Sequence, residues 1–300
     1  MTNLAVTLDD RYTFDDGRIY VTGTQALVRL MLVQRRRDEA QGLNTAGFVS
    51  GYRGSPMTTI DQELWRAKDH LESHHINFWP AVNEHMAATA VWGTQQVHYH
   101  NDARYDGVFG MWYGKGPGLD QSLDAVRQAN YHGTAKNGGV LVLAGDDPAM
   151  RSTVDAYHSE LLFEDLLMPV LYPADIQEVL DMGLYGIAMS RFSGAWLGYK
   201  LLPETIETAA SIRAGYDDLK IEIPEFEFPA DGVNSRNGDM WFNQENRIRR
   251  FKLPAAVAFA RANKLNRVTH DSGNARFGIA AMGKTWRDTL QALNELGLDE

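Results

Sequence analysis

Glu84 is the residue whose type and position best suit proton chemistry. It follows Asn83, after a strand-like segment at residues 78–82, and the residues behind it are small and apolar, beginning with Ala87 and Ala88. This pattern predicts that Glu84 lies in the first turn of a tightly packed helix, where the helix dipole favours a carboxylate but desolvation is costly. An ordinary N-terminal helix charge is the commoner alternative. A buried role would require a partner that the sequence does not name.

Two glycine-rich segments each stand between a predicted strand and a predicted helix, where glycine lets the backbone approach a ligand closely. The first is GYRGSP at residues 51–56, which equally fits an ordinary strand-to-helix turn. The second is YGKGPGLD at residues 113–120, whose three glycines in five residues exceed what a simple turn needs; a flexible loop is its alternative. The candidate ligand-binding residues in these segments are Gly51, Tyr52, Arg53, Gly54, Ser55, Pro56, Gly114, Lys115 and Gly118.

Short apolar runs alternate along the chain with longer helical patterns, which predicts an α/β fold with a parallel sheet and helices on both faces. Ligands bind at the carboxyl ends of the strands in such sheets. We therefore expect both glycine-rich segments to lie at one edge of the sheet with Glu84 between them. The predicted strands are residues 46–52, 107–112, 139–144, 169–172 and 195–201, and the predicted helices are residues 24–38, 58–72, 83–98, 119–131 and 175–191.

The pattern changes after residue 210, which divides the chain into three parts. Residues 1–210 form the expected first domain. Residues 211–270 lack a helical period at first and are rich in turn formers, so they predict a linker or arm with a helix at 253–264. Residues 271–300 predict a strand, a tight glycine turn and a helix, which would be the start of a second α/β domain. This segment resembles the C-terminal α/β domain of transketolase.

Composition excludes several classes of function. The net charge is −10, which disfavours non-specific binding to nucleic acid or anionic membranes, and no apolar stretch is long enough to span a membrane. Cysteine is absent, so the chain has no thiolate to bind zinc or an iron–sulfur cluster, and its histidines lack acidic partners at metal-site spacing. We expect no metal ligand in this chain. The polar, acidic N-terminal segment does not resemble a signal peptide, so a cytoplasmic location is expected.

Taken together, the motifs resemble those of the 2-oxoacid:ferredoxin oxidoreductases. The likeness extends over roughly residues 15–210 and is closest to the indolepyruvate type, in its long fused bacterial form. Arg53 is a departure, because many members have proline at that position. The segments that carry the likeness are GTQA at 23–26, GYRGSP at 51–56, NEHMAATA at 83–90, WYGKGPGLDQS at 112–122 and GDDPAMRST at 145–153.

The resemblance implies that this chain is the pyrimidine-binding module for thiamine diphosphate, with Glu84 hydrogen-bonded to pyrimidine N1′. It also implies cofactor contacts from Asn83 and the glycine-rich segments, and substrate contacts from Thr24, Arg53 and Lys115. Mg²⁺ and the [4Fe–4S] clusters are expected elsewhere, since Gly145 is followed by two aspartates instead of the G-D-G motif and cysteine is absent.

The activity implied by the resemblance is oxidative decarboxylation of an aryl 2-oxoacid to an acyl-CoA, with electrons passing to ferredoxin. The partners would be the 2-oxoacid, coenzyme A, ferredoxin and the remaining domains or subunits, assembled as a homodimer; we expect the chain alone to be inactive. Two alternatives stay open. One is another thiamine diphosphate module, such as a decarboxylase or a transketolase-like protein. The other is a non-catalytic α/β subunit that only binds a partner.

Overall fold

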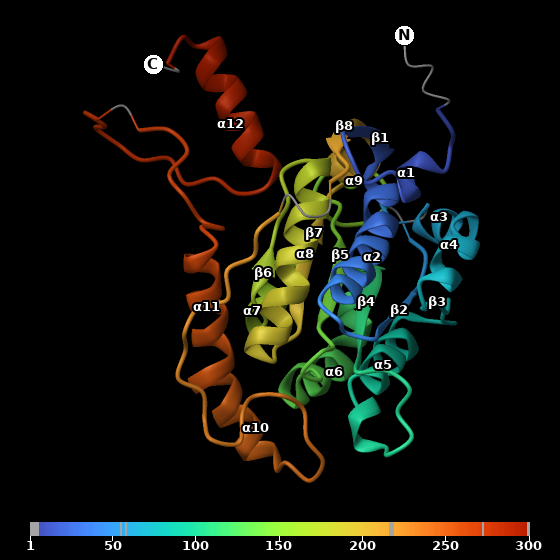
Figure 1. Ribbon diagram of the computed structural model, residues 1–300. Coiled ribbons are helices and arrows are strands. Elements are labelled where there is room, and N and C mark those ends of the chain that lie inside the picture. Colours follow the sequence, from blue (N-terminus) through green and yellow to red (C-terminus); the bar gives the residue numbers. More distant parts are fainter. Residues whose placement is uncertain (1–5, 55, 58, 216–218, 272, 299–300) are drawn as a thin grey trace.

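A parallel β-sheet forms the centre of the computed structural model, which describes residues 6–54, 56–57, 59–215, 219–271 and 273–298. Among these residues the sheet has six strands in the order β3-β2-β4-β5-β7-β6, and every neighbouring pair is parallel (Figure 1). The predicted α/β fold with a parallel sheet is confirmed. The strands are β2 (Thr45–Gly51), β3 (Ile76–Phe78), β4 (Gly107–Lys115), β5 (Val140–Gly145), β6 (Val170–Leu171) and β7 (Leu197–Leu201).

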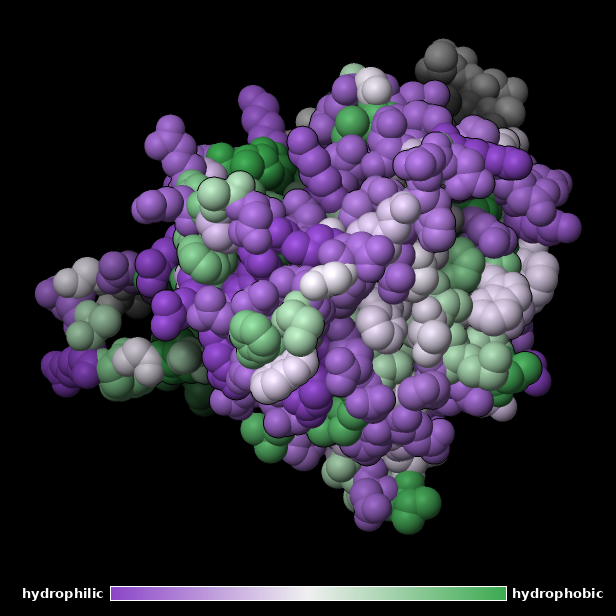
Figure 2. Space-filling view, turned by 90° about the horizontal axis from the view of Figure 1, so that it is seen from below, coloured by the Kyte–Doolittle hydropathy of each residue, from purple (hydrophilic) through white to green (hydrophobic). Residues whose placement is uncertain are grey.

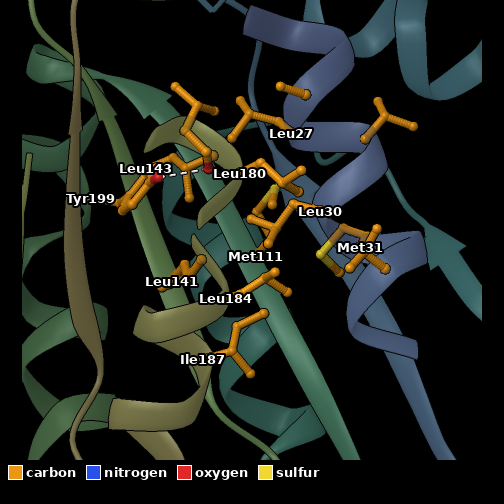
Figure 3. Packing of buried hydrophobic residues seen from close by; sticks show 14 of the residues in the cluster. Leu27, Leu30, Met31, Met111, Leu141, Leu143, Leu180, Leu184, Ile187 and Tyr199 are labelled. Carbon is orange, nitrogen blue, oxygen red and sulfur yellow. Dashed lines mark hydrogen bonds between the residues drawn. The ribbon is translucent and has the colours of Figure 1, made fainter. Parts of the chain in front are cut away.

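Helices cover both faces of the sheet. On one face α2 (Gly23–Ala40) and α8 (Ile176–Ser193) pack against a core to which Leu30, Met111 and Leu180 contribute (Figure 3). On the other face α5 (Glu84–Thr94) and α6 (Gly116–His132) pack around the buried Trp112. Strand β4 is buried nearly throughout because both faces are covered, which explains its uninterrupted apolar sequence.

Shorter helices complete the domain, and one predicted helix is divided. The helix expected over residues 58–72 is instead two helices that meet at Ala67, where φ −88° and ψ 8° end the first one. Leu64 and Leu71, on either side of this break, both belong to the core. The short elements are α1 (Asp10–Thr13), α3 (Ile60–Arg66), α4 (Lys68–Ser73), the 3₁₀ helix Val97–Tyr99, α7 (Glu160–Asp165) and α9 (Pro203–Ile206).

A separate two-stranded antiparallel sheet joins the two ends of this domain. Strand β1 (Arg18–Thr22) pairs with β8 (Ala209–Arg213), so that Arg18 lies opposite Arg213. Beside it, the buried Arg29 donates to the carbonyls of Phe14 at 2.6 Å and Ala214 at 2.7 Å. Neither strand was predicted from the sequence.

The C-terminal part follows the predicted arm, with one correction. Helix α10 (Trp241–Arg247) continues through a π-helical turn (Ile248–Lys252) into α11 (Leu253–Ala262), which packs along α8 (Figure 1). Helix α12 (Lys284–Glu295) has no buried residue. The strand predicted at residues 276–282 is wrong, because this exposed segment pairs with no strand among the described residues. The domain limits at 210 and 270 stay predictions.

The edge of the sheet where the strands begin is mostly hydrophilic, with hydrophobic residues scattered over it (Figure 2). Within the described part of the chain, no helix has both the length and the apolar character needed to cross a bilayer. The candidate site lies at the opposite edge, where the strands end.

Candidate functional site

Glu84 is the first residue of α5, as predicted. Asn83 precedes it in an extended conformation, and its Oδ1 accepts the amide of Met86 at 2.8 Å, so the Asn83 side chain is the helix N-cap. Glu84 is only 9% exposed. Its carboxylate has no hydrogen-bond or ion-pair partner among the described residues. A buried carboxylate without a protein partner is costly, and a ligand that hydrogen-bonds to it would offset that cost.

Two glycines make room for the Glu84 side chain. A methyl group on Gly118 would lie 2.5 Å from Glu84 Oε1, and one on Gly114 would lie 3.3 Å from Glu84 Cγ. Gly118 belongs to the first turn of α6, so the carboxylate lies at the N-terminal ends of two helices, α5 and α6. Both helix dipoles therefore favour a negative charge at this point.

The segment 113–120 is not a loop. Strand β4 runs to Lys115 and α6 begins directly at Gly116, so the strand passes into the helix without an intervening turn. The glycines are needed for close contact: a methyl group on Gly116 would overlap the ring of Tyr157, with its nearest atom 1.8 Å away. The alternative of a flexible loop is wrong for this segment.

The segment 51–56 folds over the ends of the central strands. The amide of Tyr52 donates to the carbonyl of Tyr113 at 3.2 Å, and a methyl group on Gly54 would lie 3.1 Å from Lys115 Cδ. Further along, Pro56 lies above Gly145 at the end of β5. The two glycine-rich segments therefore meet at one edge of the sheet, as predicted. Ser55 lies outside the described residues.

The expected substrate residues lie on both faces of the sheet at the edge where its strands end. Arg53 is exposed in the segment 51–56, and the half-buried Lys115 ends β4 beside it. Thr24 lies in the first turn of α2, which packs on the sheet face opposite α5, and its hydroxyl pairs with that of Thr22 at 3.1 Å. The preceding Gly23 packs on Ile206 just after β7, so this turn is at the same edge.

A buried charge cluster at the ends of β5 and β7 was missed. Asp146 Oδ2 accepts the amide of Ser159 at 2.8 Å and lies 3.3 Å from Lys200 Nζ, which also pairs with Glu160. Asp146 Oδ1 is buried without a hydrogen-bond partner, and burial raises the pKa of this carboxyl group above its ordinary value. The two aspartates after β5 were a usable signal, because buried carboxylates at a strand end need a cation. Among the described residues, this cluster included, no group of three or more acidic or histidine side chains could hold a metal.

Comparison with known proteins supports the likeness of the motifs. No family model matches the chain. The indolepyruvate oxidoreductase subunit IorA of Methanothermobacter thermautotrophicus is 23% identical over 97% of this chain and 43% of its own length. The corresponding subunit of Pyrococcus horikoshii is 32% identical over 59% of this chain and 24% of its own length.

This chain is similar to the indolepyruvate oxidoreductase subunits IorA. The predicted recognition is confirmed, and the chain spans less than half the length of these indolepyruvate oxidoreductase relatives. Among solved structures, a 2-oxoglutarate:ferredoxin oxidoreductase from Magnetococcus marinus matches 95% of this chain and 53% of its own, with a TM-score of 0.61 and 15% identity. At that identity, the match shows that the fold is shared.

Proposed function

We propose that this chain binds the aminopyrimidine half of thiamine diphosphate in an indolepyruvate-type 2-oxoacid oxidoreductase. The observation that carries the proposal is Glu84, a residue only 9% exposed whose carboxylate has no partner among the described residues. A basic ring nitrogen suits this site, because it would share a proton with the carboxylate and remove the cost of leaving it unpaired.

Glycines let the backbone pack closely at this edge of the sheet. Gly114 and Gly118 present no side chain beside Glu84, and Gly51 and Gly54 let the segment 51–56 pack on Tyr113 and Lys115. Tyr52, Asn83, Pro56 and Lys115 are the further expected contacts, together with Ser55. When bound, thiamine diphosphate supplies the nucleophilic carbon and the electron sink that decarboxylation of a 2-oxoacid needs.

The chain's own chemical contribution is proton handling by Glu84. Its carboxylate holds or releases a proton at the ring nitrogen, and the N-termini of α5 and α6 stabilise its charged form. Trp79, Val82 and Met86, which precede or follow Glu84 closely, are 44%, 72% and 45% exposed. A second module packed on these apolar side chains would exclude water and so strengthen the interaction between Glu84 and the ring.

The wider reaction is proposed from the resemblance of the motifs, and the names of the relatives support its substrate class. It is the oxidative decarboxylation of an aryl 2-oxoacid to an acyl-CoA with electrons passing to ferredoxin, in a cytoplasmic homodimer. Arg53 and Lys115 are the basic residues at this edge that suit the substrate carboxylate. The [4Fe–4S] clusters would come from other domains or subunits, since this chain has no cysteine. Mg²⁺ would also come from elsewhere, since Gly145 is followed by two aspartates instead of the G-D-G motif.

Ring analogues of the cofactor test the proposal directly. The protein would be the assembled enzyme that contains this chain, with dissociation constants measured for thiamine diphosphate and for two deaza analogues in the presence of Mg²⁺. We expect loss of the nitrogen at N1′ to weaken binding, and loss of the one at N3′ to weaken it less. In a Glu84→Ala variant the preference for N1′ should disappear. Failure to bind thiamine diphosphate would overturn the proposal and favour a non-catalytic binding subunit.

A further inference from the structure

Trp112 lies in β4 directly beneath the first turn of α5. Its indole Nε1–H donates to the backbone carbonyl of Glu84 at 2.9 Å, and the side chain is fully buried. This hydrogen bond joins the central strand of the sheet to the residue from which the candidate carboxylate extends. The main chain of Glu84 is thereby fixed from below.

The Glu84 side chain and the Trp112 ring share the space that Gly114 leaves empty. A methyl group on Gly114 would lie 2.7 Å from Trp112 Cη2 and 3.3 Å from Glu84 Cγ. On its other side the carboxylate abuts Gly118, where a methyl group would lie 2.5 Å from Oε1. Glu84 is therefore held at its backbone by the indole and confined along its side chain by two glycines.

We propose that Trp112 is a positioning residue for Glu84, an inference that rests on the proposed function. A shift of the Glu84 main chain would carry the carboxylate with it, and misplacement by about 1 Å can cost about 100-fold in rate. The indole N–H, and not only the bulk of the ring, is the group that prevents this shift.

Trp196 provides a matched control within the same core. It is also fully buried and belongs to the same hydrophobic cluster, but its indole nitrogen has no hydrogen-bond partner among the described residues. Replacing Trp196 with phenylalanine thus reports the loss of ring volume alone. Replacing Trp112 with phenylalanine reports the same loss together with the hydrogen bond to Glu84.

The test compares Trp112→Phe, Trp196→Phe and Glu84→Gln in the assembled enzyme. Three quantities are measured: the melting temperature, the dissociation constant of thiamine diphosphate and the rate of proton exchange at C2 of the bound cofactor. We expect both tryptophan variants to have a lower melting temperature than the wild type and to keep most of their affinity for thiamine diphosphate. Proton exchange should slow about 10- to 100-fold in Trp112→Phe and stay at the wild-type rate in Trp196→Phe. In the cofactor-free protein, amide hydrogen exchange at residues 84–88 should rise only in Trp112→Phe.

The outcomes separate the two proposals. Wild-type proton exchange in Trp112→Phe, together with slow exchange in Glu84→Gln, would overturn the positioning role and leave the proposed function intact. Wild-type exchange in Glu84→Gln would overturn the proposed function itself. If Trp112→Phe does not fold, benzothienylalanine at position 112 keeps the bicyclic ring and lacks only the N–H. Slow exchange in that variant supports the positioning role, and wild-type exchange contradicts it.

Discussion

Tyr113 and Asp61 are joined by a hydrogen bond of 2.5 Å from the tyrosine hydroxyl to Oδ1 of the aspartate. Asp61 lies in α3, just after the segment 51–56, whereas the carbonyl of Tyr113 accepts the amide of Tyr52 at the beginning of that segment. One residue of β4 therefore contacts both the beginning of the segment that folds over the strand ends and the helix that follows it. Glycine at 51 is required for this contact, since a methyl group there would lie 2.2 Å from the Tyr113 carbonyl oxygen.

Removing the hydroxyl in Tyr113→Phe is expected to lower the free energy of unfolding by about 1–3 kcal/mol at neutral pH, because a half-buried carboxylate loses its donor. Burial raises the pKa of Asp61, and the Tyr113 hydrogen bond lowers it. The variant's folded state should therefore keep the Asp61 proton to higher pH than the wild type does. The difference in free energy of unfolding between the wild type and Tyr113→Phe should therefore grow as the pH rises from 4 towards 7. Urea unfolding across this range measures the effect, with the exposed Tyr20→Phe as a control that should show none.

Glu84→Gln in the assembled enzyme should keep the fold and lose most of the turnover. Glutamine has nearly the same volume, so packing against Gly114 and Gly118 is preserved. It cannot exchange a proton with the ring, and general acid–base steps of this kind contribute about 10²- to 10⁴-fold. Turnover and melting temperature are the measurements, with the exposed Glu164→Gln as the control. An N-terminal helix charge alone predicts normal turnover and a stability change of no more than about 1 kcal/mol.

Alanine substitution should have different effects at two glycines in the neighbouring helices α5 and α6. A methyl group on Gly93 in α5 meets nothing within 4 Å, so Gly93→Ala should stabilise the protein by up to about 1 kcal/mol through helix propensity alone. Gly118→Ala should gain nothing and should weaken thiamine diphosphate binding by at least about tenfold, since the new methyl group displaces Glu84. Thermal unfolding and cofactor titration of both variants give the comparison. Equal affinity in the two variants would show that the close contact at Gly118 does not matter for binding.

Lys252, which lies away from the candidate site, should make the free energy of unfolding depend on pH. It is fully buried in the π-helical turn and donates to the carbonyls of Asn130 and Tyr131 at the end of α6. Burial lowers its pKa to about 7, with Arg247 and Arg236 adding to the effect and Asp239 opposing it. Above pH 7 the Lys252 amine is therefore protonated in the unfolded chain but neutral in the folded protein. Its contribution to the free energy of unfolding rises with pH until the pH reaches the ordinary pKa of lysine.

The stability of the wild type relative to Lys252→Met should accordingly rise between pH 7 and 9, by up to about 1.4 kcal/mol per pH unit. Denaturant unfolding of both proteins at several pH values gives this difference. The exposed Lys136→Met serves as the control and should show a constant difference from the wild type. A constant difference for Lys252→Met as well would mean that the buried amine stays charged throughout.

The parallel sheet and the position of Glu84 could be predicted because they depend on local sequence. Strands such as β4 are uninterrupted apolar runs, and a carboxylate before a small-residue helix is a local pattern. The partners of Asp146 could not be predicted, because Lys200 is distant in sequence and the pairing depends on tertiary packing. The alternative of a flexible loop at residues 113–120 was wrong for another physical reason. Its glycines serve close side-chain contacts with Glu84, Trp112 and Tyr157 instead of a turn.

The pairing of β1 with β8 has a consequence for how the domain combines with others. Residues 18 and 213 are opposite each other in the ladder, and the amide of Ala214 donates to the carbonyl of Gly17 at 3.0 Å. The ladder therefore ties the first and last strands of this domain together, while the chain on either side of it still packs on the domain through Tyr12 and α11. A neighbouring domain could be attached beyond these packed segments without stretching the sheet.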